Sequence, residues 1–130
     1  MIVFEKLKKK KEEEEFFKWL DTILKDDLLP EIKAINFNLY EDMDNKWSIE
    51  LVGTSMFDEN DDDWACCEVF SARDNIFVIE QDSEWKEIEI LFIEMVKKYL
   101  NTSKYSHKLK QYEAVGIGFV DGDMHILYRR

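Results

Sequence analysis

Five carboxylates crowd into six consecutive residues near the middle of the chain, and they are its strongest candidates for chemistry. With the two aromatic residues that flank them they form the acidic loop, residues 57–64, whose candidate binding residues are Phe57, Asp58, Glu59, Asp61, Asp62, Asp63 and Trp64. A calcium loop of the EF-hand type needs glycine at its sixth position and glutamate at its twelfth. Counted from Asp58, these positions hold Asp63 and Val69, so the EF-hand pattern is excluded.

Three interpretations of the acidic loop stay open: a solvated turn, a docking surface for a basic protein, and a looser divalent-cation site. The formal net charge of the chain is -11, and residues 34–70 carry -9 of it. Charge of this density repels nucleic acid and anionic membranes and favours basic partners. We therefore predict a non-catalytic acidic protein that binds a basic protein partner through this loop. The alternative is a divalent-cation-binding protein or metal-dependent enzyme that uses the same acids.

The remaining reactive side chains give no catalytic pattern. Cys66 and Cys67 follow the acidic loop directly, and His107 and His125 are the only histidines. A nucleophilic thiolate needs a nearby base or positive surroundings, and two adjacent cysteines lack the spacer of a zinc site. We expect both cysteines to be buried small hydrophobic residues on a strand, in a reducing compartment. The sequence predicts no catalytic residue, no metal ligand and no cofactor.

Gly116 and Gly118 resemble a nucleotide-binding loop only superficially. Such a loop must open a helix whose N-terminus receives the phosphate, whereas this segment continues into a hairpin turn at Asp121-Gly122. We expect the two glycines to let His125 or a neighbouring element pack closely on the sheet.

Two helices are predicted from apolar residues at three- and four-residue steps. The first carries its apolar stripe between Phe16 and Leu28 and ends before Pro30. Lysines precede glutamates over residues 8–15, the weaker order for helical ion pairs, so we expect residues 1–14 to be a solvated or frayed segment. The second helix begins after Asp82 or Ser83 as its N-cap and carries its main stripe from Trp85 to Tyr99. Residues 104–111 are expected to form a short helical turn.

Alternating apolar and polar residues predict the strands. Residues 34–39 and 47–51 form a hairpin, residues 76–79 form a strand covered on both faces, and residues 114–120 and 123–128 form a last hairpin. Its Asp-Gly turn, with positive φ at both central residues, is expected to place Ile126 opposite Ile117. The sheet face away from the helices then shows Asn36, Asn38, Tyr40, Ser48, Glu50, Gly118 and His125. This face is either a recognition platform or an ordinary wetted surface.

Length and composition fit one folded domain. The chain has 130 residues, of which 45% are hydrophobic and 14% aromatic, and this excludes intrinsic disorder. We predict a single domain over residues 1–130 of the α+β class. It has a mainly antiparallel sheet of about five strands, an N-terminal helix and a long helix before the C-terminal hairpin. No signal peptide and no membrane-spanning stretch are recognised, so we expect a cytoplasmic protein that binds neither nucleic acid nor membrane.

Three segments, residues 32–41, 47–54 and 62–70, resemble small bacterial proteins of the polymorphic-toxin immunity type. The resemblance covers roughly the middle third of the chain and involves no catalytic motif. It implies a compact acidic inhibitor that occludes the basic active site of a toxin.

Overall fold

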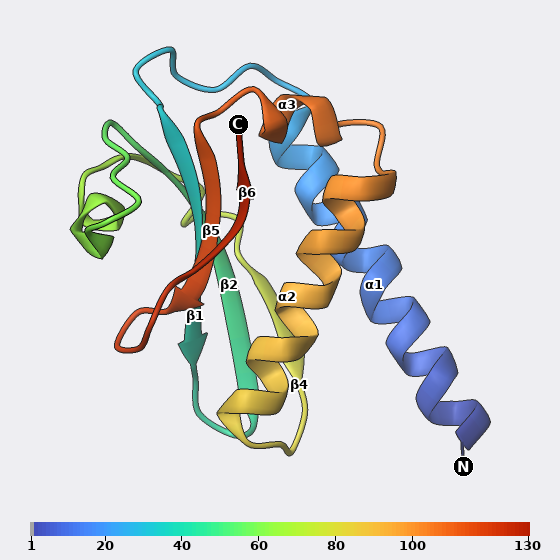
Figure 1. The fold of residues 1–130 in the computed structure, drawn as a ribbon. Coiled ribbons are helices and arrows are strands. Elements are labelled where there is room, and N and C mark those ends of the chain that lie inside the picture. Colours follow the sequence, from blue (N-terminus) through green and yellow to red (C-terminus); the bar gives the residue numbers. More distant parts are fainter. Residues whose placement is uncertain (1) are drawn as a thin grey trace.

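A mixed six-stranded sheet forms the centre of the molecule, and two long helices pack on one of its faces (Figure 1). The computed structural model describes residues 2–130, and of the side chains those of residues 4–130. The strands are β1 (Ala34–Glu41), β2 (Lys46–Thr54), β3 (Glu68–Ser71), β4 (Phe77–Glu80), β5 (Ala114–Phe119) and β6 (His125–Arg129). Their order is β3-β2-β1-β5-β6, and β4 also pairs with β2. The predicted α+β class is confirmed, but β1 and β5 run parallel, so the sheet is mixed and has six strands.

The helices are α1 (Ile2–Leu24), α2 (Trp85–Thr102) and the short α3 (Ser106–Lys110), with the 3-10 helix η1 (Asp62–Cys66) between β2 and β3. The short turn expected near residues 104–111 is thus present as α3. The N-cap of α2 is Glu84, which makes no side-chain capping bond, so the prediction of Asp82 or Ser83 was wrong. None of the helices within residues 2–130 is long and apolar enough to cross a bilayer.

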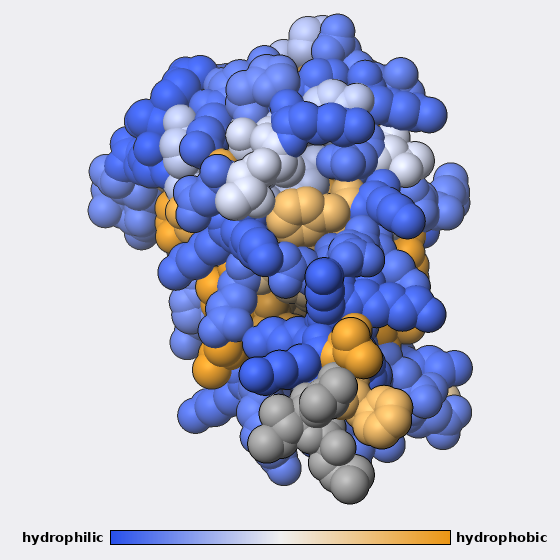
Figure 2. Space-filling model, turned by 90° about the vertical axis from the view of Figure 1, so that its right-hand side faces the viewer, coloured by the Kyte–Doolittle hydropathy of each residue, from blue (hydrophilic) through white to orange (hydrophobic). Residues whose placement is uncertain are grey.

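The segment expected to be solvated or frayed, residues 1–14, is helical from Ile2 onward, and Met1 lies outside the described residues. Residues 4–11 are exposed, and the N-terminal end of α1 extends beyond the sheet in Figure 1. Figure 2 views this side and shows a mainly hydrophilic surface with separate hydrophobic patches. The exposed hydrophobic side chains of the two helices include Phe4, Leu7 and Ile90.

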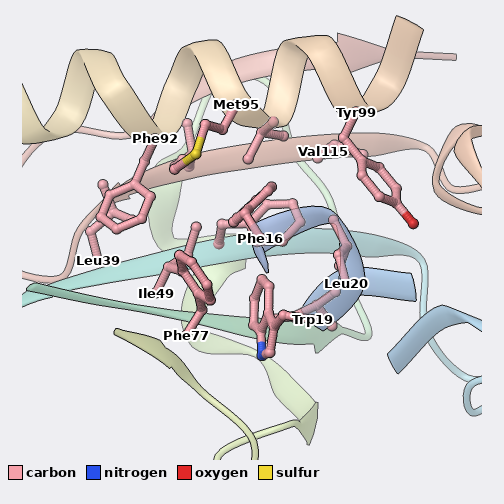
Figure 3. Close-up of a cluster of buried hydrophobic side chains, with 14 of the residues drawn as sticks. Phe16, Trp19, Leu20, Leu39, Ile49, Phe77, Phe92, Met95, Tyr99 and Val115 are labelled. Atoms are coloured by element: carbon pink, nitrogen blue, oxygen red, sulfur yellow. The ribbon is translucent and has the colours of Figure 1, made fainter. Parts of the chain in front are cut away.

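The core lies between the two helices and the sheet (Figure 3). Phe16, Trp19 and Leu20 of α1 enter it from one side, and the buried stripe of α2 enters from the other. The aromatic rings pack edge to face: the Phe16 and Phe77 centroids are 5.5 Å apart at 81°. Tyr99 is fully buried and donates a hydrogen bond of 2.6 Å from its Oη to Asp21 Oδ1, which joins α2 to α1.

The hairpin of β1 and β2 confirms the prediction from alternation, with Phe37 opposite Leu51 and Leu39 opposite Ile49. Its connecting turn contains the two non-glycine residues with positive φ, Asp44 at 60° and Asn45 at 59°. Aspartate and asparagine tolerate this left-handed conformation better than most residues, and it matches the twist of a tight hairpin.

The last hairpin differs from its prediction. A bulge between Val115 and Gly116 shifts the register, so that Ile117 pairs with His125 and Gly116 pairs with Ile126. No glycine has positive φ, so Gly122 does not adopt the expected turn, and residues 120–124 connect the strands. Because neighbouring residues of a strand point to opposite faces, this shift exchanges the sides of His125 and Ile126. His125 faces α2, where its Nε2 lies 3.2 Å from Glu89 Oε1.

The strand β4 is also different from its prediction. Phe77 and Ile79 are buried, but Val78 between them is 47% exposed. The apolar run of residues 76–79 therefore forms a short edge strand with one covered face, not a strand covered on both faces. Short edge strands of this kind limit the unpaired backbone that a sheet presents to other chains.

Candidate functional site

The acidic loop lies on the sheet face opposite the helices, where Figure 1 shows it in green to the left of the strands. It leaves the end of β2, passes through η1 and returns to β3. Trp64 is only 2% exposed and packs with Ala34 and Ala114, the first residues of the parallel strands β1 and β5. The ring of Phe57, half-buried, lies edge-on to Trp64 with centroids 5.2 Å apart. The two aromatic residues that flank the acids thus hold the loop on the sheet.

Gly116 makes room for this packing. A Cβ at this position would lie 2.7 Å from Asn36 Oδ1, 3.0 Å from Met124 Sδ and 3.3 Å from Trp64 Cζ2. As expected, the glycine lets neighbouring groups pack closely on the sheet. These groups are the acidic loop and Met124, and not His125. Within residues 4–130, Asn36 Oδ1 and Trp64 Nε1 are buried without a hydrogen-bond partner. A buried polar atom without a partner lowers the stability of the fold by about 1–3 kcal/mol. These two atoms therefore do not stabilise the docked loop, and apolar packing holds it on the sheet.

Two of the five carboxylates shape the loop itself. Asp58 Oδ1 accepts a hydrogen bond of 2.9 Å from the backbone N–H of Asn60. Asp61 is the N-cap of η1, and its Oδ1 accepts a bond of 3.0 Å from the backbone N–H of Asp63. An N-cap of this kind satisfies one of the free N–H groups at the start of a helix. Both carboxylates remain exposed, so each still presents charge to the solvent.

Arg129, near the end of β6, neutralises one acid of the loop. Its guanidinium forms a salt bridge with Glu59, and the same group lies 5.4 Å from the ring centre of Phe57. Among the described residues, Asp58, Asp61, Asp62 and Asp63 form no ion pair with a lysine, arginine or histidine. The loop therefore presents four exposed carboxylates that no cationic side chain of residues 4–130 neutralises.

The acids do not converge as metal ligands. In the part of the chain that the structure describes, no group of three or more histidine, cysteine, aspartate or glutamate side chains is arranged to hold a metal ion. Structural and catalytic metal sites need several ligand atoms around one point. The geometry therefore gives no support to the cation-binding alternative.

The cysteines lie elsewhere than expected. Cys66 is the last residue of η1 and is exposed, while Cys67 follows it and is half-buried, with its Sγ 3.6 Å from Met56 Sδ. The expectation of two buried residues on a strand was wrong, because the chain forms the 3-10 helix η1 here. Trp64 is the buried residue of this helix. Both thiols are free. His125 lies on the helix side of the sheet, so it does not face the cysteines.

Beside the acidic loop, the open sheet face carries a network of polar side chains. Glu50 is 6% exposed, and its two oxygens accept hydrogen bonds from Tyr40 Oη at 2.7 Å and Ser71 Oγ at 2.5 Å. Next to them, Asn36 Nδ2 donates to Asn38 Oδ1 at 2.6 Å. Burial, with the hydrogen bond and charge of Glu50 as further causes, raises the pKa of Tyr40 to about 12. These hydrogen bonds pair both oxygens of Glu50 and join Asn36 to Asn38, while Asn36 Oδ1 has no partner within residues 4–130.

Sequence reasoning located the acids of the loop but missed Arg129, which lies 70 residues further along the chain than Glu59 and carries no local signal of its role. The sheet brings the two together through the packing of β6 beside β5.

Comparisons with protein-family models, with curated proteins and with solved structures gave no match for this chain.

Proposed function

We propose that this chain is a non-catalytic, cytoplasmic binding protein of the immunity type, which inhibits a basic protein by docking against it with the acidic loop. The observation that carries the proposal is a set of four exposed carboxylates on one loop, Asp58, Asp61, Asp62 and Asp63, which form no ion pair with any side chain of residues 4–130. A basic toxin is the partner that the resemblance implies. The charge of the loop supports only the wider statement that the partner is basic.

The carboxylates act mainly on the rate at which the partners meet. Complementary charge steers two proteins together and raises association rates, and salt weakens the effect because the Debye length is only about 8 Å at physiological ionic strength. The loop suits this role because it stands out from the sheet on the side that the helices leave open (Figure 1). Glu59 contributes less, since Arg129 already neutralises it.

The flanking aromatic residues have a different part in the proposal. Trp64 is buried, so it holds the carboxylates in place and does not enter the partner. Phe57 is half-buried between Trp64 and Arg129, and its remaining exposed area is available as an apolar contact. Apolar contact at the centre of a charged rim is the usual arrangement of a protein interface.

Affinity capture with charge-matched baits tests the proposal. The loop variant Asp58→Asn, Asp61→Asn, Asp62→Asn and Asp63→Asn removes four charges from one place. A control variant removes the same number from scattered exposed positions, Glu14→Gln, Asp26→Asn, Glu31→Gln and Asp74→Asn. From lysate of the source cell, the wild type and the control are expected to retain the same basic proteins and the loop variant to lose them.

The same set of proteins on all three baits would contradict the assignment of the loop as the docking surface. A loss that is equal in both variants would show that total charge, and not the loop, determines binding.

A further inference from the structure

A cleft of about 530 Å³ lies at the end of the sheet where the parallel strands β1 and β5 finish and α2 begins. Its volume falls in the range of about 300–1,000 Å³ that ligand pockets occupy. Three aromatic and three acidic side chains line most of it: Tyr40, Phe119, Trp85, Glu41, Asp42 and Asp121. The acidic loop packs on Ala34, at the opposite end of β1. The cleft is therefore a separate surface, and a binding role for it goes beyond the proposed function.

Phe119 and Trp85 form the aromatic wall of the cleft, which continues the aromatic packing of the core. The ring of Phe119 contacts two tryptophans: its centroid is 6.0 Å from that of Trp47, at 72°, and 6.0 Å from that of Trp85, at 89°. Trp47 is buried, whereas Trp85, the first residue of α2, is 46% exposed. A tryptophan left half in water at the mouth of a cleft is available for stacking with a ligand.

The ring of Trp85 has a cation of its own chain beside it. The Nζ of Lys86 lies 5.6 Å from the centre of the Trp85 ring, so the ring already interacts with a positive charge of its own chain. A cation over the face of a tryptophan is attracted by the negative charge of the ring face. Lys86 is the competitor that a cationic ligand would displace from this ring.

The rim of the cleft is acidic and unpaired. Glu41 is the last residue of β1 and Asp42 follows it, and Asp121 comes from the connection between β5 and β6. All three are exposed, and within residues 4–130 none of them takes part in a salt bridge. The cleft thus combines an exposed aromatic surface with three carboxylates that no cation within residues 4–130 pairs.

We propose that this cleft binds an exposed arginine side chain of a basic protein. A guanidinium is planar and weakly hydrated, so it can stack on Trp85 while its N–H groups form paired hydrogen bonds with the carboxylates of the rim. A lysine ammonium is compact and strongly hydrated, and it lacks the flat face that stacks. Arginine is therefore the side chain that fits both the aromatic wall and the acidic rim of the cleft.

Titration of the isotope-labelled full chain with short peptides tests this proposal by NMR. The probe is acetyl-Gly-Arg-Gly-amide. The controls are the same peptide with citrulline, which keeps the shape of arginine without its charge, and with lysine. The arginine peptide is expected to shift the Trp85 indole signal and the amide signals of Val120 and Gly122, which line the cleft. The citrulline peptide should leave them in place, and the lysine peptide should bind more weakly.

Variants assign the effect to the cleft. Neutralising the rim with Glu41→Gln, Asp42→Asn and Asp121→Asn should weaken binding about fivefold, the equivalent of two exposed ion pairs of about 0.5 kcal/mol each. Trp85→Leu should weaken it about two- to fivefold through the lost stacking. Lys86→Gln should strengthen it, because the competing cation is gone. The loop variant with four asparagines should bind the peptide as the wild type does, which separates this test from that of the acidic loop.

Three results would overturn the proposal: no shifts at the cleft with the arginine peptide, equal shifts with the citrulline peptide, or binding that the rim variant leaves unchanged while its spectrum shows an intact fold. If the peptide instead shifts signals of residues 57–64, the arginine site lies in the acidic loop and the cleft is not a site.

Discussion

Replacing Trp64 tests whether the acidic loop is held on the sheet as the structure shows. Trp64→Ala removes a side chain that is 2% exposed, and truncation of a buried tryptophan costs about 3–5 kcal/mol. The substitution also removes the indole N–H that has no partner among the described residues, which returns about 1–3 kcal/mol. We therefore expect a net loss of about 2 kcal/mol in the free energy of unfolding.

Trp64→Phe separates the two contributions. Phenylalanine keeps most of the apolar contact with Ala34 and Ala114 and removes the unpaired N–H, so the two effects nearly cancel. Its stability is expected within about 1 kcal/mol of the wild type. Urea denaturation followed by circular dichroism measures both variants, and a loss of about 2 kcal/mol lowers the midpoint by about 1 M when the slope is about 2 kcal/mol/M.

Two outcomes would refute this reasoning. Equal losses for Trp64→Phe and Trp64→Ala would show that the indole N–H is hydrogen-bonded. A loss below about 0.5 kcal/mol for Trp64→Ala would show that the loop is not docked, since that is the effect expected of a surface substitution.

Further predictions concern the elements that support the site. Gly118→Ala should lower the free energy of unfolding by about 2 kcal/mol, because the added Cβ would lie 2.5 Å from the backbone oxygen of Asp123. Thermal denaturation measures this loss, and an unchanged midpoint temperature would contradict the close approach of Asp123 to Gly118. Tyr99→Phe should lower the free energy of unfolding by about 1.5 kcal/mol, because the hydrogen bond to Asp21 is lost, and urea denaturation measures this change. An unchanged free energy of unfolding would show that this hydrogen bond does not stabilise the fold. Because the unfolded Tyr40 loses its proton near pH 10 and the folded one near pH 12, stability should fall over this interval. Tyr40→Phe should lessen the fall measured by alkaline titration of stability, and an equal fall in both proteins would count against the raised pKa.

Local patterns were enough to predict the existence of the two long helices and the first hairpin, but not the bounds of the first helix. It is helical from Ile2, where a frayed segment was expected, and it ends at Leu24, before the expected end near Leu28. In β1 and β2 the alternation of residues such as Phe37 and Leu39 with polar neighbours determines which face is buried, and with one buried face the register is strongly specified. The stripe of α2 predicts the buried side of that helix, because Ile88, Phe92 and Tyr99 all lie against the core.

The last hairpin and the sheet topology depend on contacts that no local pattern contains. Asp121-Gly122 is a strong signal for a two-residue turn, yet the backbone of Asp123 packs over Gly118 and residues 120–124 form a longer connection. The bulge between Val115 and Gly116 then exchanges the sides of His125 and Ile126 in β6. The parallel pairing of β1 with β5 joins Ala34 to Ala114, far apart along the chain, which alternation cannot reveal.

For the candidate site, the sequence showed the charge but not its surroundings. The five acids are nearly contiguous, so composition alone locates the acidic loop. The pairing of Glu59 with Arg129 and the burial of Trp64 arise from the tertiary fold. The cleft beside Trp85 was missed for the same reason, because three separate segments supply its residues.

The most direct test of the central claim is the association rate of the captured basic partner, measured against ionic strength for the wild type and for the loop variant with four asparagines. If the acidic loop steers docking, the rate for the wild type falls steeply as salt rises, and the loop variant is slower at low salt with a much flatter dependence. A wild-type rate that does not change with salt, or a loop variant that follows the wild-type curve, would contradict the claim.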